Sequence, residues 1–219
     1  MSNSIETRLP TGVKDFLPVK AARLEALQST LRGIYRQWGF RPVAPAVLED
    51  LDVLGKGLGQ GLSEKAFRFD DRQSGRLVAI PPDITPQVAR ITATRMHEMP
   101  LPFRLCYHGR VLRHTEQRLG KAREVFQSGV ELIGLAGPEA DAEMIAMAVE
   151  CLAAVGATGF TIDIGQVEFL RGVLDGLPLA PAEAAEVRAA IAAKDVSTLQ
   201  RLLATSAVSD RQREELPTL

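Results

Sequence analysis

The sequence contains few of the residues that would indicate a metal centre, a membrane protein or a general nucleic-acid binder. Its two cysteines, Cys106 and Cys151, lie far apart without metal-ligand spacing, which predicts two reduced packing residues. Its 26 Lys and Arg residues face 27 Asp and Glu residues, so a net charge of −1 gives no overall attraction to nucleic acid or anionic lipid. No apolar run spans a bilayer, and residues 1–12 hold no apolar leader segment. We therefore expect a cytoplasmic protein without a metal or cofactor.

The remaining composition is that of a globular protein with a sheet covered by helices. Of 219 residues, 46% are hydrophobic and 24% are charged, which suits one large domain or one domain with a small appendage. Apolar residues three and four positions apart predict helices in residues 24–38 and 138–155. Alternation predicts a hairpin in residues 66–80 and strands in residues 102–112, 124–133 and 160–164. Short alanine-rich helices are expected beyond Gly165.

These elements predict an α+β fold with two parts. Residues 1–165 would form a core in which a mostly antiparallel sheet is flanked by helices. Residues 166–219 would form a helical appendage, because the hydrophobic pattern there contains no further strand.

The two longest predicted strands carry polar residues and glycines on one face. Side chains of a strand alternate between its two faces, so every second residue shares a face. One face of the first strand carries Tyr107, Gly109, Val111 and Arg113, and one face of the second carries Gln127, Gly129 and Glu131. The other face of the second strand is more apolar, with Phe126, Ser128, Val130 and Leu132, and is suited to packing under helices.

Two interpretations of the polar face stay open at this point. Arg113, Gln127 and Glu131 are solvated sheet residues, as alternation alone would predict, or they form the floor of a small-molecule pocket. Glycines beside polar residues allow a ligand to approach the backbone. Residues 104–123 also contain six Lys and Arg against one acid, Glu116, which favours a pocket with a local anion site.

Other features of the sequence predict ordinary structural roles. Residues 55–61 (GKGLGQG) lack the Gly-Lys-Ser/Thr ending of a phosphate-binding loop, which favours a flexible loop. Asp83 and Thr85 precede a helix that begins near Pro86, so capping of that helix is one role for both and the favoured role for Thr85. His108 and His114 have no second ligand at zinc spacing, so they are interpreted as ordinary strand and loop residues.

Several segments in order resemble the catalytic core of class II aminoacyl-tRNA synthetases of the histidyl type. The resemblance covers residues from about 10 to 165 and is greatest to the regulatory branch of that family, the ATP phosphoribosyltransferase regulatory subunits. It is carried by TGVKDFLP, YRQWGF, RPVAPAVLED, IPPDITPQVAR and RVLRHTEQRLGKAREVFQSGVELIG. It implies a class II synthetase-like core.

The resemblance implies a histidine-binding site on the polar face. Asp83, Gln127 and Thr85 would meet the α-amino group, Arg113 the carboxylate or phosphate end, and Glu131 the imidazole. These charges match, since carboxylates accept from an ammonium and a guanidinium donates to a carboxylate. The expected anion-binding residues are Arg113, Lys121 and Arg123. No catalytic residue is expected.

The sequence also departs from a working synthetase. Thr115 stands where the second signature motif carries a glutamate that positions the nucleotide, and Pro81 replaces an arginine. Ala46 stands where the first motif, matched by residues 41–50, has its proline. No third signature motif and no anticodon-binding domain is recognised, so the family pattern implies a C-terminally incomplete form.

Together these features predict a regulatory subunit that is not itself an enzyme. The resemblance implies that it activates the short catalytic subunit of ATP phosphoribosyltransferase in the first step of histidine biosynthesis, and that L-histidine acts as inhibitory effector. It also implies a homodimer through residues 41–50 within a hetero-oligomer. The alternative is a fragment of a divergent histidyl-tRNA synthetase that activates its amino acid. A tRNA-binding module is disfavoured by the near-neutral charge.

Overall fold

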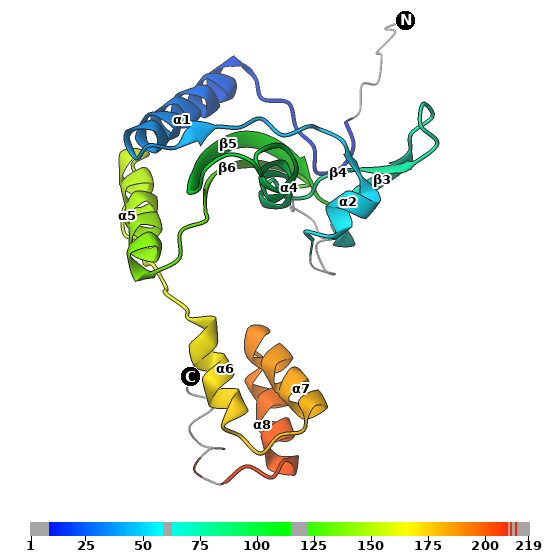
Figure 1. Ribbon diagram of the computed structural model, residues 1–219, viewed down its shortest axis with the longest axis vertical. Helices are drawn as coiled ribbons and strands as arrows, with labels where there is room; N and C mark the ends of the chain where they lie inside the picture. Colours follow the sequence, from blue (N-terminus) through cyan, green and yellow to red (C-terminus); the bar gives the residue numbers. More distant parts are fainter. Residues whose placement is uncertain (1–8, 59–62, 115–121, 210, 212, 214–219) are drawn as a thin grey trace, which may run out of the picture. The chain divides into compact units, whose positions relative to one another are not determined.

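The computed structural model describes residues 9–58, 63–114, 122–209, 211 and 213. They fall into two compact units, divided between Gly159 and Phe160, and each unit is described by itself. The elements of the first unit are α1 (Pro18–Gln37), β1 (Arg41–Pro42), β2 (Glu49–Asp50), α2 (Leu51–Gly55), β3 (Phe67–Asp70), β4 (Leu77–Ile80), α4 (Thr85–Arg95), β5 (Phe103–Leu112), β6 (Glu124–Ile133) and α5 (Pro138–Ala154). Figure 1 shows this arrangement.

The main sheet of the first unit has the order β1-β5-β6. The short β1 is parallel to β5, whereas β5 and β6 form a regular antiparallel ladder of ten residues each. This ladder matches the two long strands predicted by alternation, and the bounds of β6 are those predicted. The α+β fold with a largely antiparallel sheet is therefore confirmed.

Helices α1 and α5 cover one face of this sheet. Ile34 and Tyr35 of α1 and Met147 of α5 are buried against Cys106 of β5, and both cysteines are free thiols in this core. The Tyr35 hydroxyl lies 2.9 Å from the hydroxyl of Ser128 on β6. The prediction that this face packs under helices is correct. The sequence also predicts a buried stripe of Met144, Ala148, Cys151, Leu152 and Val155, which is only partly correct, because Leu152 of α5 and Val155 directly after it are 37% and 36% exposed.

Helix α4 lies against the opposite face, which carries the polar residues singled out from the sequence. Val88 of α4 and Ile84 before it pack on Leu105, Tyr107 and Val111 of β5. The residues that lead into α4 therefore lie over the polar face.

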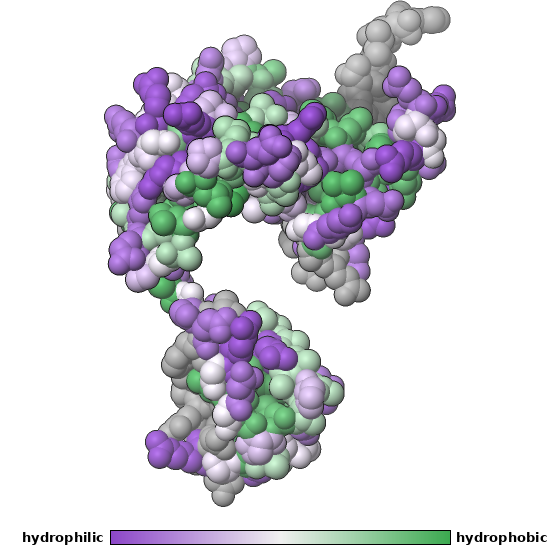
Figure 2. All heavy atoms as spheres, viewed as in Figure 1, coloured by the Kyte–Doolittle hydropathy of each residue, from purple (hydrophilic) through white to green (hydrophobic). Residues whose placement is uncertain are grey.

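A second sheet, of order β2-β4-β3, contains the predicted hairpin of β3 and β4. Glu49 of β2 is 8% exposed, and its carboxylate accepts two hydrogen bonds from the Arg90 guanidinium of α4, at 2.6 and 2.9 Å. The Gln87 amide donates a third, at 3.1 Å. This ion pair ties the second sheet to α4. Figure 2 shows hydrophilic residues over much of the visible face of this unit, with exposed apolar residues in patches among them.

The second unit is helical, as predicted for this part of the chain. It contains α6 (Val167–Asp175), α7 (Pro181–Ala192) and α8 (Val196–Thr205), which share a core that includes Leu174, Val187 and Leu203. The sequence also predicts a helix in residues 209–216, of which only residues 209, 211 and 213 are described, and residues 59–61 of the glycine-rich segment 55–61 lie outside the described residues. No helix in the described ranges is both long and apolar enough to cross a membrane.

The strand predicted in residues 160–164 is wrong. Phe160, Ile162 and Ile164 lie in irregular chain and are 39%, 36% and 74% exposed. Alternation predicts which face of a strand would be buried, but a strand also needs a neighbour to bond with, and none of the described strands pairs with this segment.

Candidate functional site

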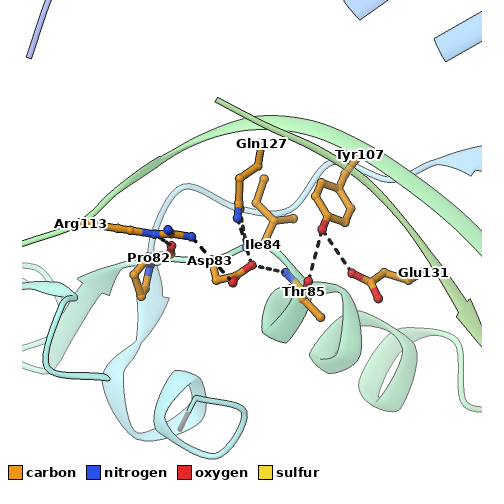
Figure 3. A network of polar contacts seen from close by, with 8 residues as sticks. All are labelled: Pro82, Asp83, Ile84, Thr85, Tyr107, Arg113, Gln127 and Glu131. Atoms are coloured by element: carbon orange, nitrogen blue, oxygen red, sulfur yellow. Dashed lines mark hydrogen bonds and ion pairs between the residues drawn. The ribbon is translucent and has the colours of Figure 1, made fainter. Parts of the chain in front are cut away.

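Five predicted site residues and Tyr107 meet in one polar cluster on the α4 side of the main sheet (Figure 3). The ladder pairs Tyr107 with Gly129 and Gly109 with Gln127, which puts Tyr107, Gln127 and Glu131 on the same face. The remaining members come from the ends of elements. Asp83 lies in the turn between β4 and α4, Thr85 begins α4, and Arg113 directly follows β5.

Asp83 is the centre of the first half of the cluster. Its Oδ1 accepts from the Gln127 side-chain amide at 3.3 Å and from the Thr85 backbone N–H at 3.2 Å. Its Oδ2 lies 4.0 Å from a guanidinium nitrogen of Arg113. Because Oδ1 already accepts two bonds, Oδ2 is the oxygen with more capacity for a ligand.

Gln127 holds the turn before α4 in place through both ends of its amide. The oxygen accepts from the Ile84 backbone N–H at 3.0 Å while the nitrogen donates to Asp83. Arg113 fixes the same turn from the other side, since its Nε donates to the Pro82 carbonyl at 2.9 Å. The turn is therefore positioned by side chains that lie far away in the sequence.

The second half of the cluster is a chain of hydroxyls that ends on Glu131. The Tyr107 hydroxyl donates to Oε1 of Glu131 at 3.2 Å and lies 3.2 Å from the Thr85 hydroxyl. A phenol has one proton, so the hydroxyl of Thr85 is the donor to Tyr107. Burial raises the pKa of Tyr107 to about 12, the hydrogen bond from Thr85 opposes this shift, and the charge of Glu131 adds to it. Tyr107 thus stays protonated and orients the carboxylate.

Two expectations about this face need correction. Thr85 makes no side-chain cap bond; the residue before the helix is Ile84, and the Thr85 hydroxyl turns to Tyr107 instead. The space beside the two glycines is taken by protein atoms: a Cβ at Gly109 would lie 2.7 Å from Ile84 Cδ1, and one at Gly129 would lie 2.7 Å from the Tyr107 hydroxyl oxygen. Because a glycine has no side chain, Gly109 leaves room for the Ile84 side chain and Gly129 for the Tyr107 hydroxyl.

The expected anion-binding residues do not all join the cluster. The Arg123 guanidinium lies 4.6 Å from the centre of the Phe67 ring, and it donates to the Thr11 carbonyl at 3.4 Å. Its backbone carbonyl accepts from the Arg113 N–H. Lys121 lies outside the described residues. Of the three expected anion-binding residues, Arg113 is therefore the one that the described structure places beside a carboxylate of the cluster, that of Asp83.

The charges of the cluster suit a ligand that carries a cationic group. Two carboxylates, Asp83 and Glu131, against one guanidinium, Arg113, leave a net charge of −1. The side chains of Arg113 and Asp83 are 30% and 25% exposed, so solvent reaches both. The cluster offers acceptors for an ammonium, a separate carboxylate for a ring N–H, and a forked donor for an anion.

Nothing in the described ranges forms a group of three or more metal-ligating side chains. His114 packs edge-on against the Phe67 ring at 6.1 Å, and its backbone N–H donates to the Lys65 carbonyl. From the sequence, Tyr107 either lines a pocket or simply packs, and the structure places its hydroxyl between Thr85 and Glu131 in the cluster. Its position opposite a glycine on the polar face was the available signal.

Comparison with known proteins places these residues in a family context. The family profile described as histidyl-tRNA synthetase matches residues 12–219. The chain is 63% identical to the ATP phosphoribosyltransferase regulatory subunit of Syntrophotalea carbinolica over 98% of the chain and 50% of that relative. It is 52% identical to the protein of the same name from Geobacter sulfurreducens, over 98% of the chain and 49% of the relative. The chain spans about half the length of the curated relatives that it matches.

A solved structure is similar over the whole chain. It is described as an ATP phosphoribosyltransferase regulatory subunit/histidyl-tRNA synthetase from Bacillus halodurans. The two share a TM-score of 0.89 at 25% identity, covering 100% of this chain and 56% of the other.

Proposed function

Because the chain belongs to the histidyl-tRNA synthetase family, we propose that it is part of a regulatory subunit of ATP phosphoribosyltransferase that binds histidine on the polar face of β5 and β6. The class II synthetase-like core expected from the sequence is confirmed by the solved relatives. The names of the most similar curated relatives support the regulatory role.

The observation that carries the proposal is the convergence of Asp83, Thr85, Arg113, Gln127 and Glu131. They come from one strand, the residue after a second strand, a turn and a helix start, and together with Tyr107 they form one network of hydrogen bonds in which Arg113 joins through the Pro82 carbonyl and an ion pair with Asp83. Solvated sheet residues would not need to converge, so the convergence supports a binding site over the alternative that the sequence left open.

Histidine matches this cluster group by group. Its ammonium would be bound by Asp83 Oδ2 and the lone pairs of the Thr85 hydroxyl, which donates its own proton to Tyr107. Its carboxylate would lie near the guanidinium of Arg113. The imidazole N–H would donate to Glu131, whose Oε1 is held by Tyr107. The amide of Gln127 would keep the turn that carries Asp83 in position.

Regulation requires that histidine bind two assembly states with different affinity, because a ligand shifts an equilibrium only by its differential affinity. We propose the catalytic subunit of ATP phosphoribosyltransferase as the partner and residues 41–50 as the contact of a homodimer. Val47 and Leu48 in that segment are 75% and 47% exposed, which leaves apolar surface for such a contact.

The test is a calorimetric titration of histidine into the wild type and two matched variants. Glu131→Gln keeps the size of the side chain but removes the charge that accepts from the ring N–H, so the Kd should rise by roughly 10–100-fold. Glu124→Gln changes an acid on the opposite face of the same strand and should leave the Kd unchanged. Equal affinities of wild type and Glu131→Gln would refute the site.

A second function, amino-acid activation, shares the same cluster. A synthetase would use these residues to hold histidine while it forms an adenylate. Histidine-dependent exchange of pyrophosphate into ATP separates the two functions. We expect no exchange, and robust exchange by the wild type that is lost in Glu131→Gln would establish the synthetase alternative.

A further inference from the structure

The face of the sheet opposite the polar cluster borders a cavity. It is an open groove of about 610 Å³ between α1, the back of β5 and β6, and the segment that precedes α1. Its charged and aromatic lining includes Lys14, Phe16, Arg32, His108, Arg110 and Phe126. Because His108 and Arg110 alternate with Tyr107 and Gly109 along β5, the groove and the polar cluster lie on opposite faces of the same strand.

His108 carries two buried ring nitrogens, neither of which has a hydrogen-bond partner within the described chain. The ring is held by stacking on Tyr35 of α1, with centroids 5.7 Å apart. Burial lowers the pKa of His108, and the charge of Arg32 lowers it further. A neutral imidazole has one N–H donor and one acceptor, and leaving either unpaired costs roughly 1–3 kcal/mol. Since His108 lines the groove, a partner there would satisfy one of these nitrogens once the ring turns from its present position, in which both are buried.

Arg32 provides the positive charge beside this imidazole. It is exposed on α1, and it acts electrostatically on both His108 and Cys106 on the back of β5. In the described ranges it forms no ion pair. Arg110 of β5 also lines the groove, but its charge is already paired, because it lies 3.0 Å from Glu124 and 4.6 Å from the centre of the Phe126 ring.

We propose that this groove is a second binding site, for a small organic oxyanion held between the Arg32 guanidinium and the His108 N–H. A carboxylate or a phosphate monoester would both supply the acceptor oxygens that these two donors need. The aromatic rings of Phe16 and Phe126, whose centroids lie 5.1 Å apart, would contact the apolar part of the ligand. Asp15 and Glu25 also line the groove, so its charge is positive only at the Arg32 end.

The test uses the imidazole NMR signals of the chain, which has three histidines. Inorganic phosphate and acetate are titrated separately at constant pH, with sodium chloride at matched ionic strength as the reference for screening. One of the two oxyanions should shift the His108 signals saturably, and this identifies the class of the anionic group. At saturation the pKa of His108 should rise by roughly 1 pH unit or more, because a nearby anion favours the imidazolium.

Two variants of α1 distinguish specific binding of the anion in the groove from general screening by salt. Arg32→Gln should weaken the apparent affinity by about tenfold or more, since it removes a charge-assisted partner. Arg23→Gln removes the same charge nine residues earlier, about half a turn around the helix, and should bind like the wild type. Shifts that match those in sodium chloride, or equal affinities of Arg32→Gln and Arg23→Gln, would overturn the proposal.

Discussion

Replacement of Tyr107 by phenylalanine tests whether the phenol is buried in the network that orients Glu131. Tyr107 is 7% exposed, and its hydroxyl joins Thr85 to Glu131 through two contacts of 3.2 Å. Phenylalanine keeps the ring in the core beneath α4 and removes both contacts. Because a net hydrogen bond contributes about 0.5–1.5 kcal/mol, Tyr107→Phe should lower the free energy of unfolding near neutral pH by roughly 1–3 kcal/mol.

The contribution of Tyr107 to the free energy of unfolding should also depend on pH in the alkaline range. Burial and the nearby Glu131 carboxylate raise the pKa of Tyr107 from 10.0 to about 12. A raised pKa favours the protonated form in the folded state, so its stabilising contribution is complete below about pH 10 and is lost as pH rises toward 12. Two pH units correspond to about 2.7 kcal/mol, so the loss should be on the order of 2–3 kcal/mol. The phenylalanine variant has no proton to lose and lacks this decline.

Urea denaturation of both proteins at about pH 8.5 and about pH 11.5 measures the difference directly. The stability gap between wild type and Tyr107→Phe should narrow as pH rises. Tyrosinate absorbance follows the same ionisation independently. The chain has two tyrosines, and burial raises the pKa of Tyr35 as well as that of Tyr107, so neither phenol should ionise at its ordinary pH in the folded protein. A gap that does not change with pH would refute this account, as would tyrosinate formation near pH 10 in protein whose circular dichroism is still native.

Three further changes test other parts of the structure. Arg90→Met should lower the free energy of unfolding by about 3–5 kcal/mol in urea denaturation, because it leaves the buried carboxylate of Glu49 unpaired. Gly129→Ala places a methyl group within 2.7 Å of the Tyr107 hydroxyl, so calorimetry should show weaker histidine binding. Leu203→Ala should cost about 2–5 kcal/mol in the helical unit, and histidine affinity should be unchanged because Leu203 lies in the core of that unit and is not a member of the proposed site.

The sequence was most informative where a long alternating pattern continued without interruption. Residues 126–132 of β6 place Gln127, Gly129 and Glu131 on one face and mainly apolar residues on the other, so the two faces of this strand were predictable. Gln127 and Glu131 could be placed on one face for the same reason. The antiparallel pairing then places Tyr107 opposite Gly129, which joins the residues of β5 to them.

Contacts between distant segments could not be predicted from periodicity. The bond from the Ile84 N–H to the Gln127 oxygen joins residues 43 positions apart and depends on how the turn before α4 lies over the sheet. Local preference misled the interpretation of Thr85, because threonine is a common helix cap and only the tertiary position of Tyr107 gives its hydroxyl another partner. The alternation in residues 160–164 misled for a related reason, since a pattern contains no information on an available neighbour.

The polar cluster satisfies much of its own hydrogen-bonding capacity without a ligand. Asp83 already accepts from Gln127 and from the Thr85 backbone, and Glu131 already accepts from Tyr107. Histidine would therefore either form an additional hydrogen bond at Asp83 Oδ2 or replace hydrogen bonds that the cluster already forms. Replacing one hydrogen bond by another gives little net free energy of binding. We expect the free energy of binding to come mainly from the charged ammonium and carboxylate, so blocking either group should weaken binding more than methylation of the ring nitrogen remote from Glu131. Calorimetric titration with histidine methyl ester, with Nα-acetylhistidine and with each of the two ring-methylated histidines measures this order, and equal losses from all four would contradict it.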